Sequence, residues 1–395
     1  MDKVLINEYS RRLKEIAKDL SFLGHPRYPL KALMDLFPQH KHFISTLEDV
    51  DVPFPVDVKL KRNRIDDFLR DLSYSDLPVM MKKIFTDRVM DYHLLISMME
   101  NFGNRIFYQS CTKLYGSSKK TQNEAFYYFL EKIPDFCVND ESLENLQGHS
   151  AMNYLKKKMA ETFDPNDYEV KPSSSLLSDS SAGRKTLKLN TNKSYSTQLL
   201  DIFLVHEGWV HLGTSINGGA QPDHPWLSTW APRTTYLQEG LAILTELVTK
   251  TMTKERWNKV VLRHIGTCMA ENGSCITEIY SYFRHHHMED LDALKVSLRI
   301  FRGVPLEGGM AFTKELLYLH GLAELLYHLH FFQIDLRTLW VGKVSFEEHA
   351  MLIQNWKVFD PRIKYFPEQL QSIEALKRLQ ALKELSFSLF KGGFL

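Results

Sequence analysis

The chain has 395 residues, of which 44% are hydrophobic and 25% are charged, a composition typical of a folded globular protein. This length is sufficient to bury one large core or two lobes. The 49 Lys and Arg residues balance 48 Asp and Glu residues, so no overall field exists to hold nucleic acid or an anionic membrane.

Cysteine usage and the N-terminal segment bear on the cellular compartment. The four cysteines, at positions 111, 137, 268 and 275, form no C-x-x-C pair and are too few for a disulfide scaffold of this size. The first 24 residues interleave charges every few positions, so they lack the apolar stretch of a secretory signal and predict an amphipathic helix. No apolar window of about 18 residues occurs, so no membrane-spanning segment is expected. We therefore expect a cytoplasmic protein with reduced thiols and no membrane partner.

The predicted elements are helical except in one region. Apolar residues recur at helical spacing from about residue 78 to 114, and two shorter helices follow before residue 165. Two short alternating runs, residues 168–171 and 186–190, then flank a Ser-rich loop and predict a small antiparallel β element. Beyond it the helical period returns, and we expect helices near 195–213, 235–252, 254–271, 276–287, 289–302, 312–331, 345–356 and 369–391.

These elements predict an α+β fold that is predominantly helical, with the β element directly before the helix at 195–213. No internal repeat or low-complexity tract is visible, which favours one compact unit. Any division would fall near residue 165. It would give a helical N-terminal lobe at 1–165 and a second lobe with the C-terminal helices at 166–395.

The stretch LVHEGWVHLG places His206, Glu207 and His211 on one predicted helix. Zinc peptidases usually space these histidines four apart, whereas here the spacing is five, which turns the side chains ~140° apart on a regular α-helix. A π-bulge would return both rings to one face. Gly208 in the spacer would ease that distortion and leave room for a ligand. Two unrelated core histidines explain the motif alone equally well, because H-E-x-x-x-H should occur by chance in about one such sequence in 20.

A catalytic zinc needs a third protein ligand and one open position. Glu239, near the start of the helix in TTYLQEGLAILTELVTK, would complete a His2Glu set, although by itself a carboxylate there is explained by the helix dipole. Glu246, two turns further on, could accept a hydrogen bond from a ligand histidine or simply be solvated. Glu207, beside a ligand histidine, has the position of a general base that takes a proton from zinc-activated water and passes it to the leaving amine.

Four motifs occur in an order that resembles a known family. They are HEGWVH, NGGAQP at 217–222, QEGLA at 238–242 and FRGVPLEGGMAFTKELLYLHG at 301–321. The resemblance, which runs from about residue 110 to 330, is to a family of proteins with a QEGLA motif. Its bacterial members are labelled flavohaemoglobin expression-modulating proteins, and its animal members include the microtubule-associated tyrosine carboxypeptidases.

The resemblance implies a gluzincin-like metallopeptidase core at 166–395, one zinc ion per chain and a peptide or protein C-terminus as substrate. It carries the zinc ligands over to His206, His211 and Glu239, and the catalytic glutamate to Glu207. The animal enzymes resemble zinc peptidases that remove the C-terminal tyrosine of α-tubulin, so a tubulin-like tail is a candidate substrate. The family usually has H-E-[IV]-G-T-H, and the different spacer of this chain puts the shape of the substrate pocket in doubt more than the metal.

A carboxypeptidase must bind the free carboxylate of its substrate, which requires a cation near the metal. Arg302 and Lys314 are the candidates, since both lie in the block at 301–321, although surface cations at helix ends are the alternative. Tyr318 could donate a hydrogen bond to the oxyanion or belong to the core. The glycines of the block, Gly303, Gly308 and Gly309, would let the backbone approach a ligand. The run LKLNTN could pair with the substrate backbone as an edge strand, or pair only within its own hairpin.

Our leading hypothesis is a zinc-dependent metallocarboxypeptidase that removes a C-terminal residue, and the resemblance favours an aromatic residue such as tyrosine. The rival hypothesis is a non-catalytic, zinc-containing regulatory protein, in line with the label of the bacterial members. Three protein ligands beside a glutamate favour the enzyme, because a structural zinc site usually has four protein ligands. An endopeptidase is a third hypothesis.

Overall fold

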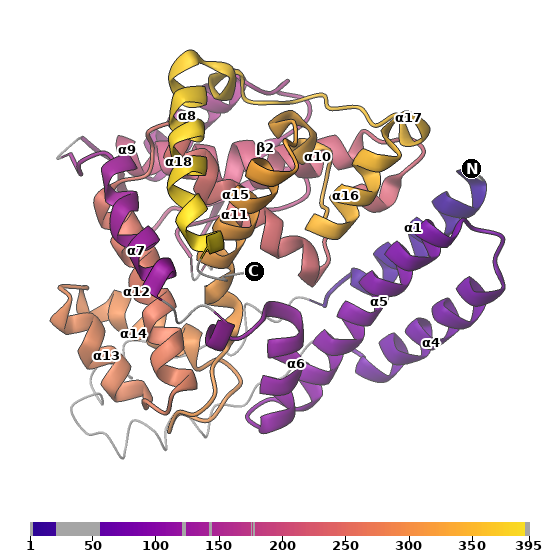
Figure 1. Ribbon diagram of the computed structural model, residues 1–395, viewed down its shortest axis with the longest axis horizontal. Helices are drawn as coiled ribbons and strands as arrows, with labels where there is room; N and C mark the ends of the chain where they lie inside the picture. Colours follow the sequence, from indigo (N-terminus) through magenta and orange to yellow (C-terminus); the bar gives the residue numbers. More distant parts are fainter. Residues whose placement is uncertain are drawn as a thin grey trace.

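The computed structural model describes residues 3–20, 56–120, 124–141, 144–174, 176 and 178–391. Figure 1 shows a mostly helical molecule, with the N-terminal helices at one end and the other helices gathered around the centre. The helices of the first part are α1 (Lys3–Ala17), α4 (Val58–Tyr74), α5 (Val79–Glu100), α6 (Arg105–Tyr115), α7 (Glu124–Lys132) and α8 (Gly148–Ala160). The predicted N-terminal helix is therefore confirmed.

Three of these helices, α1, α4 and α5, pack together on the right in Figure 1. The buried residues of α1 include Ile6, Tyr9 and Leu13, which recur at helical spacing and form one apolar face. Tyr9 meets Phe68 of α4 edge to face, with ring centroids 5.3 Å apart. The first helix is thus anchored by its apolar face, as amphipathic spacing predicts.

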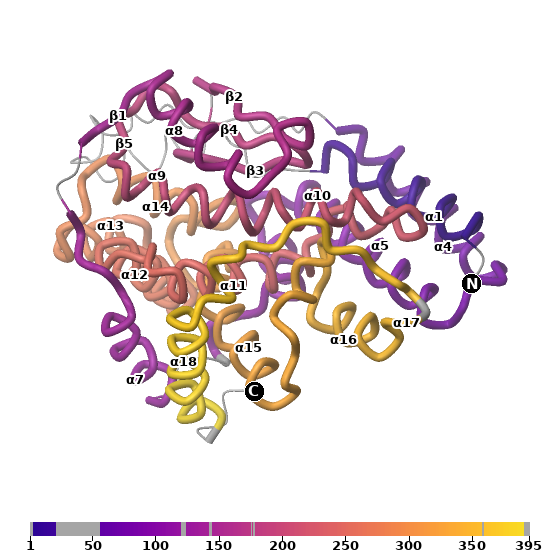
Figure 2. The backbone as a smooth tube through the Cα atoms, turned by 90° about the horizontal axis from the view of Figure 1, so that it is seen from above, coloured from indigo at the N-terminus to yellow at the C-terminus, as the bar shows by residue number. Residues whose placement is uncertain are grey.

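Two small sheets lie beside α8, along the upper side of the molecule in Figure 2. The strands are β1 (Asn145–Gln147), β2 (Glu169–Ser173), β3 (Ser180–Ala182), β4 (Thr186–Asn190) and β5 (Ser194–Ser196). β1 pairs with β5 in antiparallel fashion, and the other sheet has the order β2, β4, β3. Both predicted runs are strands, and the expected antiparallel pairing occurs between β1 and β5 and between β3 and β4. The two predicted runs, β2 and β4, are parallel to each other, so their expected antiparallel pairing was wrong. The Ser-rich segment between them contains β3, which is the antiparallel partner of β4.

β4 lies between β2 and β3, so it has no free edge. The prediction that LKLNTN could receive a substrate backbone was therefore wrong. The strand instead buries Leu187 and Leu189 in an apolar cluster with Met159 of α8 and Leu204 of the following helix. The sheet thus supports the segment that carries the two histidines.

After β5 the chain is helical. α9 (Thr197–Phe203) continues without a break into the π-helix η3 (Leu204–Leu212) and then α10 (Gly213–Gly219). The later helices are α11 (Pro232–Val248), α12 (Lys254–Glu271), α13 (Ile276–His285), α14 (Asp290–Ile300), α15 (Leu317–Phe331), α16 (Phe346–Gln354), α17 (Trp356–Phe359) and α18 (Ile373–Lys391). These agree with the predicted helices to within a few residues at most ends. α11 begins earlier than predicted because Pro232 occupies its first turn, where a missing N–H costs nothing.

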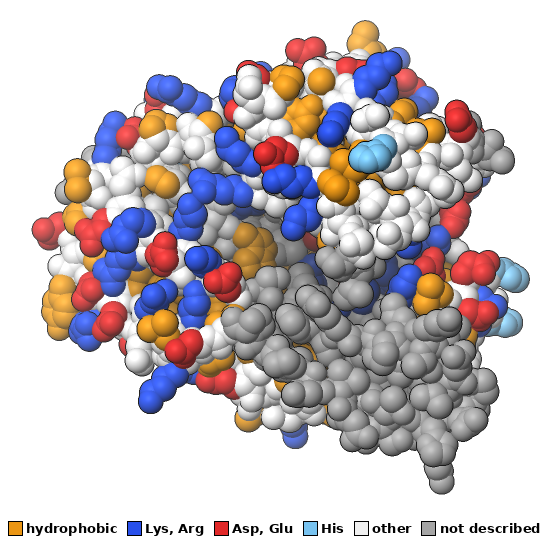
Figure 3. All heavy atoms as spheres, turned by 180° about the vertical axis from the view of Figure 1, so that it is seen from behind, with side chains coloured by type: hydrophobic (Ala, Val, Ile, Leu, Met, Phe, Trp, Pro, Cys, Tyr) orange, Lys and Arg blue, Asp and Glu red, His pale blue; other side chains and the backbone are white. Residues whose placement is uncertain are grey.

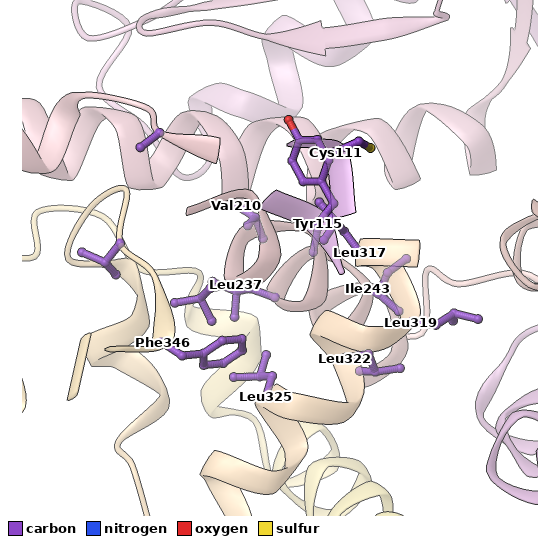
Figure 4. Packing of buried hydrophobic residues seen from close by; sticks show 14 of the residues in the cluster. Cys111, Tyr115, Val210, Leu237, Ile243, Leu317, Leu319, Leu322, Leu325 and Phe346 are labelled. Atoms are coloured by element: carbon purple, nitrogen blue, oxygen red, sulfur yellow. The ribbon is translucent and has the colours of Figure 1, made fainter. Parts of the chain in front are cut away.

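α11 is the most deeply buried helix near the site, and it crosses α15 at a pair of glycines. A Cβ placed on Gly240 would lie 2.2 Å from the carbonyl carbon of Gly321, so the two backbones touch directly. Leu237 and Ile243 of α11 and Leu322 of α15 fill the neighbouring space (Figure 4). The depth of α11 in the core is therefore set by backbone contact, and α11 carries the QEGLA motif.

The fold is predominantly helical with small sheets, as the sequence predicts. Within the described residues, no helix is long and apolar enough to cross a membrane. The division near residue 165 into lobes at 1–165 and 166–395 stays a prediction.

Candidate metal centre

The two histidines of HEGWVH project from the π-helix η3. The backbone N–H of Gly213 donates to the carbonyl of Gly208, five residues earlier, as in a π-helix. The wider turn places the rings of His206 and His211 side by side, with centroids 4.8 Å apart and planes at 87°. The predicted π distortion is confirmed, and it brings two histidines that are five residues apart to the same face of the helix.

The spacer between these histidines faces the interior. A Cβ on Gly208 would lie 2.6 Å from the sulfur of Met159, so this side of the glycine packs against α8. The prediction that Gly208 leaves room for a ligand was therefore wrong. Trp209 is buried in the same apolar cluster, and its carbonyl accepts a hydrogen bond from the indole of Trp340 at 2.9 Å. The unusual spacer thus contributes to the core rather than to the cavity that Glu207 lines.

Glu239 of α11 brings a third donor to the histidines. Its Oε2 lies 3.4 Å from Nε2 of His206 and 3.6 Å from Nε2 of His211, and the three donor atoms are within 4.8 Å of one another. This oxygen is buried and, among the described residues, has no hydrogen-bond partner. Burying such a group costs free energy that a cation would offset. Two imidazoles and a carboxylate could therefore hold a divalent metal ion here.

The surrounding charges keep this cluster attractive to a cation. Burial acts to raise the pKa of Glu239, but the positive charge of Lys314, 3.7 Å from Oε1, and the two imidazoles hold the pKa well below its usual value. Burial acts to lower the pKa of His206, yet Glu239 and Glu246 raise it to about 9. Positive charge is thus favoured at this point, and a metal ion would compete with the proton on His206.

Glu246, two turns after Glu239 on α11, contacts His206 from the opposite side. Its Oε1 lies 2.7 Å from Nδ1 of His206, and because a carboxylate only accepts, Nδ1 donates and Nε2 is left facing Glu239. Arg256 of α12 donates to both oxygens of Glu246. The predicted contact between Glu246 and a histidine of the motif is confirmed.

A cavity of about 400 Å³ opens beside His206 and Glu207. Cations from two helices line it, and the apolar part of its wall is formed by Leu199, Ile202, Phe203, Met288 and Val296. Figure 3 shows that the face opposite to that of Figure 1 carries Lys and Arg side chains around a hollow. The candidate metal centre is thus open on one side to a space that could admit the end of a peptide.

Of the predicted substrate-binding residues, the structure brings Tyr318 to the cavity wall. Its ring is stacked near that of His206, with planes 25° apart and centroids 6.3 Å apart. Lys314 contacts Glu239 and is not part of the wall. Arg302 lies elsewhere, with its guanidinium 5.8 Å from the centroid of the Phe312 ring. The structure therefore does not support a role for Arg302 at this cavity.

The glycines of the same block have structural roles. Gly303 and Gly308 adopt φ angles of +75° and +94°, which other residues rarely adopt. A Cβ on Gly303 would lie 2.4 Å from the Phe107 ring, and one on Gly308 would lie 2.4 Å from the Gly273 carbonyl oxygen. The prediction that these two glycines admit a ligand was wrong. Gly309 also has a positive φ, of +84°, but no described atom lies within 4 Å of its Cβ position.

Three arginines of the cavity wall were not predicted. Arg256 and Arg263, with Lys259 between them, recur at helical spacing along α12, so a stripe of positive charge on one face of that helix was the available signal. Arg299 of α14 has no comparable signal, because its partner Glu315 comes from a different element. Lys343, which donates to Gln238 at 2.7 Å, lies outside all four motifs.

The fold and this cluster define a predominantly helical protein with a His2Glu candidate metal centre beside a cavity. Residues 40–388 match the model of the family described as microtubule-associated tyrosine carboxypeptidase. Since the match covers most of the chain, the chain belongs to this family, as its four motifs predicted. The family description implies carboxypeptidase activity, which is that of a hydrolase. A comparison with curated proteins finds no match.

Proposed function

We propose that the chain is a zinc-dependent metallocarboxypeptidase, with a gluzincin-like core, that removes the C-terminal residue of a peptide or protein. The family description supports the carboxypeptidase activity. The observation that carries the zinc assignment is the buried Oε2 of Glu239, which faces the Nε2 atoms of His206 and His211. These donors are typical of catalytic zinc, which is held by three protein ligands and keeps a fourth position open.

In this proposal His206, His211 and Glu239 hold the ion, and Glu207 acts on the attacking water. Zinc bound there would polarise the scissile carbonyl and make water more acidic. Glu207 follows His206 in the π-helix, is partly exposed and lines the cavity, so water can reach its carboxylate. Glu207 would accept a proton as water attacks the carbonyl carbon, and would then deliver that proton to the leaving amine.

We assign binding of the terminal carboxylate of the substrate to Arg263 and Arg299, in place of Arg302. Both line the cavity and share one buried carboxylate, that of Glu315, at 3.4 Å from Arg263 Nη1 and 2.6 Å from Arg299 Nη2. Two guanidinium groups against one carboxylate leave an excess of one positive charge, suited to a carboxylate ligand. The guanidinium of Arg263 also lies 4.8 Å from the centroid of the Tyr318 ring, which connects this pair to the metal side of the cavity.

Lys314 and Tyr318 have separate roles in this proposal. Lys314 lies 3.7 Å from Oε1 of Glu239 and is only 12% exposed, so it orients that ligand rather than the substrate. Burial raises the pKa of Tyr318, so its phenol keeps its proton and can donate a hydrogen bond to the oxyanion. The apolar wall of the cavity offers contact for an aromatic side chain such as tyrosine. Because the family description names microtubules, we propose a tubulin-like tail as the first substrate to test.

The decisive experiment measures zinc content and hydrolysis of peptides that end in tyrosine. Wild type should bind one zinc per chain and release tyrosine, and Glu207→Gln should keep zinc while activity falls by about 100-fold or more. The control Glu131→Gln, on the exposed face of α7, should behave as wild type.

Amidation of the peptide C-terminus separates the remaining alternatives. It should abolish cleavage by a carboxypeptidase, whereas continued cleavage would indicate an endopeptidase. If zinc-loaded wild type cleaves none of a broad set of peptides, the rival hypothesis of a non-catalytic, zinc-containing regulatory protein is favoured instead.

A further inference from the structure

Gln238, the residue before Glu239 on α11, is the meeting point of three side chains. Its Oε1 lies 2.7 Å from Nζ of Lys343, 2.8 Å from Oγ1 of Thr214 and 3.5 Å from Nδ1 of His211. Gln238 and Lys343 are only 3% and 8% exposed, so water competes little for these contacts. The proposed chemistry uses neither residue, which leaves their convergence on His211 to be explained.

Lys343 determines which end of the amide faces the histidine. Nζ of Lys343 donates to the amide oxygen, and an ammonium group, which only donates, cannot face the amide nitrogen. Burial lowers the pKa of Lys343 to about 7, so this constraint is fullest below that pH. Lys343 is itself fixed, because Nζ also donates to the carbonyl of His211 at 2.8 Å and its backbone N–H donates to the carbonyl of Leu227 at 2.7 Å. The backbone carbonyl of Lys343 accepts in turn from Arg88 at 2.5 Å. The orientation of the amide thus follows from the hydrogen-bond chemistry around it.

The oriented amide selects one tautomer of His211. Oε1 of Gln238 can only accept, so a hydrogen bond at this contact requires the ring proton to be on Nδ1. A neutral imidazole has one N–H, so Nε2 keeps its lone pair. Nε2 is the atom that faces Oε2 of Glu239 at 3.6 Å. Glu246 faces Nδ1 of His206 in the same way, so each histidine has its own acceptor on α11.

A packing role does not explain an amide at this position. The amide nitrogen of Gln238 is buried and has no hydrogen-bond partner within the described parts of the chain. Burying an unsatisfied N–H group costs free energy that a methionine or leucine of similar size would avoid. The amide is therefore present for its oxygen.

We propose that Gln238 is a positioning residue for His211, holding the tautomer and ring orientation that metal binding requires. This inference rests on the proposed zinc centre. Hydrogen bonds of this kind to a metal-ligating histidine typically change metal affinity by about 10–100-fold. Lys343 acts on His211 through Gln238, and replacing Lys343 would also change the charge near the metal. Substitution of Gln238 isolates the hydrogen bond.

The test compares Gln238→Met with Gln238→Glu. Methionine has a similar length but no amide oxygen, whereas glutamate keeps two acceptor oxygens. We expect zinc affinity, measured by competition with a chromophoric chelator, to fall about 10–100-fold in Gln238→Met and to stay within about 10-fold of wild type in Gln238→Glu. The absorption spectrum of bound Co²⁺ should change in the methionine variant only. If Gln238 served only packing, zinc affinity should instead be kept in Gln238→Met, where methionine fills the space. It should then fall in Gln238→Glu, where glutamate buries a charge.

Urea unfolding of the metal-free proteins tests whether each variant is folded. If Gln238→Met is not folded, Gln238→Leu takes its place. Equal zinc affinity in wild type and in the folded methionine or leucine variant would overturn the role of Gln238 and leave the proposed function intact. Failure of wild type to take up zinc or Co²⁺ would overturn the proposed centre itself, and the role of Gln238 with it.

Discussion

Replacing Gly240 by alanine should displace α11 from α15 and disturb the candidate metal centre. The new Cβ would lie 2.2 Å from the carbonyl carbon of Gly321 and 2.3 Å from its oxygen, whereas ordinary contact begins at 3.4 Å. Both atoms belong to the backbone and cannot rotate away, so the helices must separate by roughly 1 Å. Because Glu239 precedes Gly240 on the same turn, its carboxylate would move with the helix.

Two effects of this substitution oppose each other. Overpacking of a core costs about 1–3 kcal/mol, and a clash between two backbones belongs at the upper end of that range. Alanine favours a helix over glycine by about 1 kcal/mol. We therefore expect the free energy of unfolding of the metal-free protein to fall by about 2 kcal/mol. Zinc affinity should fall by about 10-fold or more, because a metal site tolerates displacements of only about 0.5 Å.

Urea unfolding and zinc titration measure the two effects separately. Gly219→Ala is the matched control, since Gly219 ends α10 and no described atom lies within 4 Å of its Cβ position. The control should change the free energy of unfolding by less than about 1 kcal/mol. If Gly240→Ala is no less stable than this control, backbone contact does not set the depth of α11, and the reasoning is refuted.

Two further perturbations test buried groups that do not contact the candidate metal ligands. Arg88→Met removes a fully buried guanidinium that donates to Glu348 at 2.7 and 2.8 Å, and the unpaired carboxylate should cost about 3–5 kcal/mol in urea unfolding. Adding Glu348→Gln should recover part of this loss, and full additivity of the two losses would contradict the pairing. Burial lowers the pKa of His264 from 6.5 to about 4, so the unfolded state binds more protons between these pH values. Stability should therefore decrease as the pH falls through this window, by up to about 3 kcal/mol, when unfolding at pH 7 is compared with pH 4.5. His264→Leu should reduce that difference, and equal acid sensitivity of the two proteins would disprove the role of His264.

Local patterns in the sequence predicted the helices and the distortion between the histidines. Amphipathic spacing is encoded within a few turns, and α12 and α14 were therefore located to within two residues at each end. The spacing of His206 and His211 predicted the π-helix because no regular α-helix brings those rings to one face. The approach of these two rings to Glu239 was predicted from the chemistry of the donor set and not from any local period in the sequence.

Contacts between distant segments could not be predicted in the same way. The parallel pairing of β2 with β4 depends on the path of the Ser-rich segment, which carries β3. Arg302 was chosen for its place in a motif, but the turn at Gly303 and the Phe312 ring decide where its guanidinium lies. Lys343 reaches Gln238 across more than 100 residues of sequence, and no motif links the two.

One helix accounts for most of the geometry of the candidate centre. η3 only brings the two imidazoles together, whereas α11 supplies the carboxylate between them and the acceptor for the outer nitrogen of each ring. Since Gly240 and Gly321 fix the depth of α11, the donor atoms are held by core packing, and metal binding should require little rearrangement. The arginines of the cavity wall come instead from α12 and α14. Substitutions on those helices can therefore alter which peptide is bound while the centre itself is preserved.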